Sequence, residues 1–208
     1  MIPMPVFFIC FILFVLWIHV KYKQDNKGKS TWDEEFWERE KEANFARKKS
    51  IEDLDYIVIP EEDLPFRDNA AGEEKHLQDN VRKLLSKKIL NLSGQTNTDL
   101  KLAYGTANFN ELSEYDQNFN DLLRCLNLWG TYLHKNVPEA SCRALQILEY
   151  AISLGSDITD TYRCVAEIYL ENNNFQKINQ LIEQVEETDF FMKDSIIRQL
   201  KDVIRSYS

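Results

Sequence analysis

Hydrophobic and polar residues follow three successive patterns along this chain of 208 residues. The first pattern is an apolar run over residues 6–20, which contains no formally charged side chain. With the apolar residues upstream, residues 2–20 would span roughly 28 Å as a helix, close to the ~30 Å hydrocarbon core of a bilayer. The run therefore predicts a single transmembrane helix within residues 1–20.

Two other interpretations of this run fit its flanks less well. A cleaved secretory signal needs basic residues before the run and a small-residue cleavage site after it, and the sequence has neither. A lipoprotein signal would depend on Cys10, which has no small residue beside it. An uncleaved anchor is therefore the preferred interpretation.

The charges that flank the run predict its orientation. No Lys or Arg precedes the apolar run. Four lysines follow it within residues 21–31, namely Lys21, Lys23, Lys27 and Lys29. Basic residues collect on the cytoplasmic side of membrane helices. We therefore expect a single-pass protein of the cell membrane, with residues 21–31 as a basic tether and the soluble domain in the cytoplasm.

The second pattern, over residues 32–72, is a charged helix followed by an extended acidic arm. The helix over residues 32–49 has acids in its first turn and bases in its last, the order that the helix dipole favours. Its aromatic residues Trp32, Phe36 and Trp37 could lie at the membrane surface or pack on the rest of the domain. We favour packing, because the many acids around them would be repelled by an anionic membrane surface. The arm carries a net charge of −6 over residues 50–68 and one β-prone run, residues 56–59, which has no evident partner strand.

The third pattern is a helical period that runs from residue 73 to the C-terminus. Apolar residues recur there at spacings of three and four, and Gly155, Pro138 and the run of Asn172, Asn173 and Asn174 separate the segments. The expected helices cover residues 73–92, 99–107, 108–135, 138–154, 159–172, 175–187 and 190–206. The fold class predicted is all-α, an N-terminal transmembrane helix followed by a domain of helical hairpins over residues 73–208.

The last hairpins resemble tetratricopeptide repeats over about residues 127–187. The residues that carry the resemblance are Tyr162, Val165, Ala166 and Tyr169 on one helix, Ile178, Ile182 and Val185 on the next, and Ala144, Leu148 and Ala151 one 34-residue period before those three. Such repeats present the first helix of each pair toward a partner, so the resemblance implies Tyr162, Glu167 and Tyr169 as partner contacts. Packing within the core is the alternative role for the two tyrosines.

The whole chain also resembles uncharacterised single-pass membrane proteins of Firmicutes. This resemblance lies in the Trp–Asp–Glu-rich helix, the DYIVIP segment of the arm and the TDLKLAYG segment that follows residue 97. It implies no activity.

Composition narrows the function classes. The net charge is −9 and the estimated pI is near 5.0, so the chain has no basic surplus with which to bind nucleic acid non-specifically. Gly and Pro are scarce, at 6 and 5 residues, in agreement with a helical fold. Outside the apolar run the odd set of Cys125, Cys142 and Cys164 is unlike a disulfide framework.

No catalytic motif accompanies these patterns. The chain has no P-loop, GxGxxG, HExxH, GxSxG or CxxC sequence, and His76 and His134 each stand alone without a ligand-spaced companion. The cysteines fall among apolar neighbours, where a free thiol commonly fills space in a core. We therefore predict no catalytic, cofactor-binding or metal-binding residues, no small-molecule substrate, and a protein that is not an enzyme.

Two hypotheses of function follow. The first is a membrane-anchored protein-interaction or scaffold protein, held in the membrane by residues 2–20, whose helical domain binds a protein partner. The alternative is a small accessory subunit that stabilises a larger membrane complex through its transmembrane helix. An enzyme with a site assembled from scattered acids is the third and least favoured class.

Overall fold

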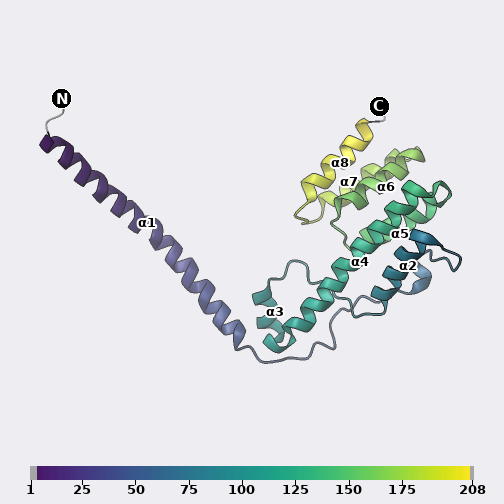
Figure 1. The fold of residues 1–208 in the computed structure, drawn as a ribbon, viewed down its shortest axis with the longest axis horizontal. Helices are drawn as coiled ribbons and strands as arrows, with labels where there is room; N and C mark the ends of the chain where they lie inside the picture. Colours follow the sequence, from purple (N-terminus) through teal and green to yellow (C-terminus); the bar gives the residue numbers. More distant parts are fainter. Residues whose placement is uncertain (1–3, 207–208) are drawn as a thin grey trace. The chain divides into compact units, whose positions relative to one another are not determined.

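The computed structural model describes residues 4–206, without the side chains of residues 4–10 and 23–31 (Figure 1). Every regular element within these residues is helical, which confirms the all-α fold class. The α-helices are α1 (Met4–Asn44), α2 (Gly72–Leu85), α3 (Asn97–Tyr104), α4 (Phe109–Asn136), α5 (Ser141–Ser153), α6 (Thr159–Glu171), α7 (Phe175–Glu186) and α8 (Lys193–Arg205). The short 3-10 helices are η1 (Glu61–Asp63), η2 (Thr106–Asn108) and η3 (Pro138–Ala140).

The chain forms two compact units. The first contains Met1–Asp53 and Gly94–Glu111, and the second contains Leu54–Ser93 and Leu112–Ser208. The candidate partner contacts all lie in the second unit.

In the first unit, the end of α1 packs against α3 and η2. Arg39 forms an ion pair with Asp99 at 2.6 Å, and Lys101 lies 3.4 Å from Glu40. The Asp99 carboxylate also caps α3 by accepting a hydrogen bond from the Thr96 backbone N–H, in a capping box. Hydrogen bonds to Thr96, and after them the charge of Arg39, lower the pKa of Asp99.

The helix α1 differs from the segments expected from sequence. The tether over residues 21–31 and the charged helix are parts of one continuous helix, which ends at Asn44 rather than near residue 49. Apart from Gly28 the tether has no strong helix breaker, and one glycine costs only about 1 kcal/mol relative to alanine. The aromatic residues Trp32, Phe36 and Trp37 are exposed, so the structure does not bear out their expected packing on the domain.

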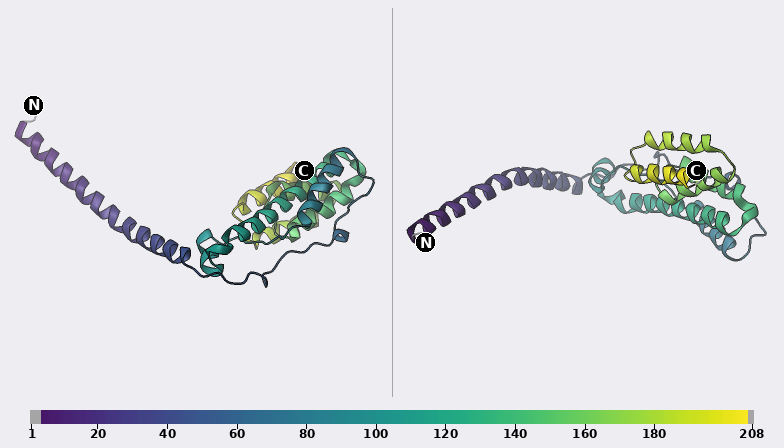
Figure 2. Two further views of the ribbon diagram at one scale, coloured as in Figure 1. Left: turned by 60° about the horizontal axis from the view of Figure 1, so that its bottom comes forward. Right: turned by 90° about the horizontal axis from the view of Figure 1, so that it is seen from above.

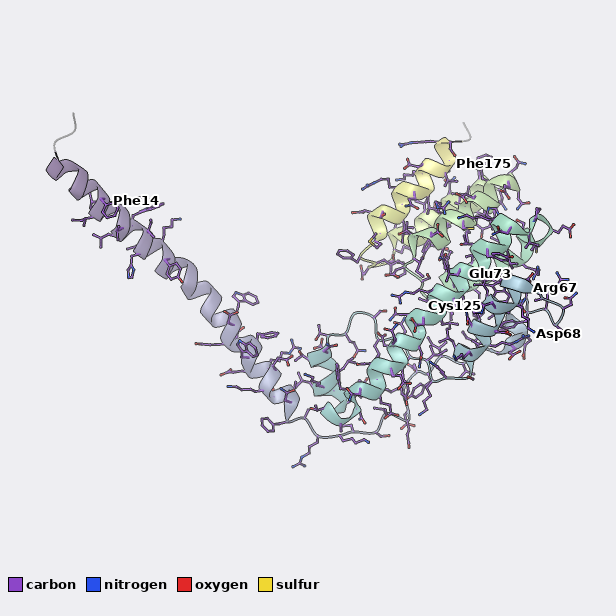
Figure 3. The ribbon with its side chains drawn as sticks, in the orientation of Figure 1. Phe14, Arg67, Asp68, Glu73, Cys125 and Phe175 are labelled. Carbon is purple, nitrogen blue, oxygen red and sulfur yellow. The ribbon has the colours of Figure 1, made fainter. Side chains whose placement is uncertain are left out.

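The expected membrane anchor falls on the first part of α1. Among the residues that the structure describes, no helix combines the length and the hydropathy that crossing a membrane requires. Residues 1–3 and the side chains of residues 4–10, which belong to the predicted anchor, lie outside the described residues. From Phe11 to Val20 the described side chains are exposed, and Phe14 projects from the helix (Figure 3).

In the second unit, the acidic arm packs apolar side chains against the helices. Ile59 and Leu64 are buried, and the Phe66 ring stacks on Trp129 of α4 with centroids 5.0 Å apart. The β-prone run forms no strand in the described residues, and the Ile57 N–H instead donates a hydrogen bond to the Ile89 carbonyl at 2.9 Å.

The helices α4 to α8 form the body of the second unit (Figure 2). Gly130 on α4 permits close approach of α5, because a Cβ at that position would lie 2.5 Å from Leu148 Cγ. Gly155 ends α5 with φ +92°, as expected of a glycine after a helix, and Asn173 closes the α6–α7 turn with φ 56°. The last helix, α8, packs against both α6 and α7.

Candidate functional site

A cavity of about 480 Å³ lies among α5, α6, α7 and the segment after α7. Its lining is mostly apolar or aromatic and consists of Glu149, Ile152, Ser153, Gly155, Tyr162, Val165, Tyr169, Leu181, Gln184, Val185, Thr188 and Phe190. The α6 members, Tyr162, Val165 and Tyr169, are three and four residues apart, so the helical period places them on one face. This cavity is large enough to accept a side chain of a partner.

Tyr162 and Tyr169 contribute two uncharged side chains to the lining, and we call this part of the lining the floor of the cavity. The Tyr162 hydroxyl donates a hydrogen bond to the Ser156 carbonyl at 2.8 Å, and the Tyr169 hydroxyl donates one to Glu149. Burial, and after it the charge of Asp157, raises the pKa of Tyr162 to about 12. Burial also raises the pKa of Tyr169, with a further contribution from Glu149. Both hydroxyls therefore stay protonated near pH 7, so the two tyrosines add no charge to the cavity.

One ion pair lies beside this floor. Lys177 of α7 approaches Glu149 of α5 at 3.5 Å, and its Nζ lies 4.9 Å from the centroid of the Tyr169 ring. The pair compensates the one charged residue of the lining. The interior of the cavity consequently favours an uncharged, apolar group.

The structure separates the three candidate partner contacts. Tyr162 and Tyr169 are only 2% and 8% exposed, so they are packing residues as well as part of the cavity lining. Glu167 is outside this lining, and its Oε1 accepts a hydrogen bond from Arg163 Nη1 at 2.5 Å. Two of the three residues are thus brought together at the cavity, and Glu167 belongs to a different cluster.

That second cluster joins α4 to α6. The ligand atoms of His134, Cys164 and Glu167 lie within 4.8 Å of one another. His134 Nε2 is 3.9 Å from Glu167 Oε2 and 3.8 Å from Glu171 Oε1, both longer than a hydrogen bond. Burial, followed by the charge of Glu167, raises the pKa of Cys164 to about 11, so this thiol is protonated near pH 7.

Sequence reasoning missed this cluster because it considered His134 and Cys164 one at a time. The available signal was the spacing of Cys164, Glu167 and Glu171, three and seven residues apart, which places all three on one face of a helix. His134 lies 33 residues before Glu167, close to the 34-residue period of the hairpins. Combining the helical spacing with the repeat period would have placed the four residues together.

Two contacts join α4 to α6 at sequence separations of 34 and 33 residues. Thr161 of α6 donates a hydrogen bond to Asn127 of α4, 34 residues earlier, at 2.9 Å. His134, two turns after Asn127, faces Glu167, so α4 and α6 run parallel with an offset of about one period. Comparison of the chain with protein-family models, curated proteins and solved structures gives no significant match, so membership of a repeat family stays a prediction.

Proposed function

We propose that this chain is a membrane-anchored protein-interaction or scaffold protein whose helical hairpins bind a segment of a partner protein. The observation that carries the proposal is the cavity among α5, α6 and α7. Its apolar walls and neutral floor suit one large apolar side chain of the partner. The parallel offset of α4 and α6 by 34 residues supports a tetratricopeptide-like arrangement of these hairpins.

The charges around the cavity indicate what flanks that apolar side chain in the partner. Four exposed acids alternate in sequence with the lining residues of α7 and the segment after it: Glu183, Glu186, Glu187 and Asp189. A segment with basic residues beside its apolar anchor complements this surface. The bound segment is therefore proposed to be apolar and basic.

The exposed apolar side chains of α1 support the proposed anchor. Apolar side chains from Phe11 to Ile18 are exposed all round the helix, without cover from other described residues. Water is a poor solvent for such a surface, and a lipid bilayer would cover it. With the lysines after residue 20, this supports membrane attachment through residues 2–20 and a domain on the cytoplasmic side.

Obstruction of the cavity tests the proposed binding function. We expect Gln184→Trp, at an exposed lining position, to weaken partner binding at least about tenfold, or about 1.4 kcal/mol, because the indole occupies the cavity mouth. A photoreactive amino acid at Ser153, a second exposed lining position, would report binding as a discrete crosslinked adduct in native membranes. The full-length chain is used throughout.

The matched control is Asn179→Trp, which places the same indole at an exposed position of α7 outside the lining. We expect this variant to keep the Ser153 adduct at its original yield, while Gln184→Trp loses it. Equal adduct yields in the two tryptophan variants would contradict binding in this cavity.

Replacement of the anchor separates the two hypotheses of function. We expect the Ser153 adduct to persist when residues 2–20 are exchanged for an unrelated membrane-spanning helix, because the contact is made by the helical domain. Loss of the adduct, with the exchanged chain still in the membrane fraction, would favour an accessory subunit that associates through its own transmembrane helix. Membrane flotation of both chains measures the attachment itself.

A further inference from the structure

The cluster of His134, Cys164, Glu167 and Glu171 contains the residue types of a metal site, and three of its ligand atoms lie within 4.8 Å of one another. Cys164, Glu167 and Glu171 lie on one face of α6, and His134 faces them from the last turn of α4. All four residues belong to the second compact unit. The cluster supplies one sulfur, one imidazole nitrogen and two carboxylates, the ligand types that Zn²⁺ binds.

The distances fit a single ion. Two ligand atoms about 2.0–2.1 Å from a tetrahedral ion lie about 3.4 Å apart, and a thiolate at about 2.3 Å lies slightly farther from its neighbours. His134 Nε2 is already 3.9 Å and 3.8 Å from the two carboxylate oxygens, and the Cys164, His134 and Glu167 atoms lie within 4.8 Å. Movement of each of the Cys164, His134 and Glu167 side chains by about an ångström would bring their ligand atoms onto one ion.

The surroundings orient the ligands. Arg163 holds Oε1 of Glu167, which leaves Oε2 directed toward His134. Arg163 also forms an ion pair with Asp160, which lies beside the cluster and compensates the positive charge of the guanidinium. Such outer contacts fix the orientation of the coordinating side chains in metal sites.

We propose that Cys164, His134 and Glu167 bind one Zn²⁺ ion, with Glu171 as a fourth ligand on the solvent side. On binding, the Cys164 thiol gives up its proton to solvent and the thiolate sulfur bonds to zinc, with no change of oxidation state. Cys164 is buried, His134 is nearly buried and Glu171 is exposed. The four protein ligands therefore run from the core to the surface and would occupy all four positions of a tetrahedral ion. The ion would link α4 to α6, a structural role that does not depend on the proposed function.

Metal titration of the full-length chain in detergent tests this site. After chelator treatment, we expect one Zn²⁺ per chain to bind and to raise the thermal midpoint by roughly 5–10 °C at a zinc concentration 100-fold above Kd. Co²⁺ in place of Zn²⁺ should give a thiolate-to-cobalt charge-transfer band and visible bands of tetrahedral intensity. These bands identify the sulfur ligand directly.

We expect Cys164→Ala and His134→Gln each to weaken zinc binding by about 100-fold or more. Cys164→Ala should also abolish the thiolate-to-cobalt charge-transfer band. The matched controls remove the same residue types at exposed positions, Cys142→Ala and His76→Gln, and should leave affinity unchanged. Circular dichroism checks that each variant is folded. Absence of stoichiometric zinc binding in the unmodified chain, or binding that survives both ligand variants, would overturn the proposal.

Discussion

Replacement of Trp129 by alanine is expected to lower the free energy of unfolding by about 3–5 kcal/mol. Trp129 on α4 is 0% exposed, and its ring stacks on Phe66 from the acidic arm. The substitution leaves a large cavity and releases the arm from the helices. Urea unfolding of the full-length chain in detergent, followed by far-ultraviolet circular dichroism, measures the loss.

The matched control for this substitution is Trp32→Ala on α1, where the same residue type is 77% exposed. Its expected effect is within about 0.5 kcal/mol, because no buried contact is lost. Trp129→Phe should cost much less than Trp129→Ala, since the buried indole Nε1 has no hydrogen-bond partner among the described residues. Similar losses for Trp129→Ala and Trp32→Ala would contradict the packing described for α4.

Replacement of Gly105 by alanine is expected to destabilise the α3–η2 turn by about 3 kcal/mol, from backbone strain and steric overlap together. Gly105 has φ +89°, and a Cβ there would lie 2.5 Å from the Arg47 carbonyl oxygen and 2.7 Å from Lys48 Cα. Both are backbone atoms of the first unit, which cannot rotate aside as a side chain can.

The nearby Lys49 amide provides the measurement, because its N–H donates a hydrogen bond to the Tyr104 carbonyl at 3.0 Å. We expect its hydrogen exchange to become roughly 100-fold faster in Gly105→Ala. Gly94→Ala is the control, since Gly94 has φ +83° but a Cβ there would meet no described atom within 4 Å, and should lose only about 1–2 kcal/mol. Equal effects of the two substitutions would exclude steric overlap with residues 47 and 48 as the cause.

The helices of the C-terminal half could be predicted because their signals are local. The expected segment 159–172 and the observed α6 (Thr159–Glu171) agree to within one residue. The turn that follows contains Asn174, whose side chain accepts a hydrogen bond from the Lys177 N–H and caps α7. Periodicity, caps and turn residues are all properties of short sequences.

The expected helix over residues 73–92 shows where local signals fail. The observed α2 ends at Leu85, although the apolar spacing continues to residue 92. Beyond it, the Leu90 N–H donates to the Tyr115 carbonyl at 3.3 Å and the Leu92 N–H donates to Asp116 at 3.0 Å. These tertiary hydrogen bonds replace the helical ones, and the apolar residues Ile89, Leu90 and Leu92 are buried in a segment that is not helical.

The sequence predicted only some of the residues that line the cavity. The resemblance to tetratricopeptide repeats pointed to Tyr162 and Tyr169, which both line the cavity, but also to Glu167, which does not. All three lie on α6 and differ only in the face they occupy. Which neighbour covers each face depends on the packing of α4, α5 and α7 around α6.

The sequence by itself determined the all-α class and most helix boundaries of the C-terminal half, because helical spacing and end signals act within a few residues. Only the tertiary structure decided that His134 meets Cys164 and Glu167. That meeting requires the register of α4 against α6, which is fixed by contacts far apart in sequence, such as the hydrogen bond between Asn127 and Thr161. Side-chain packing sets such a register, and no local pattern encodes it.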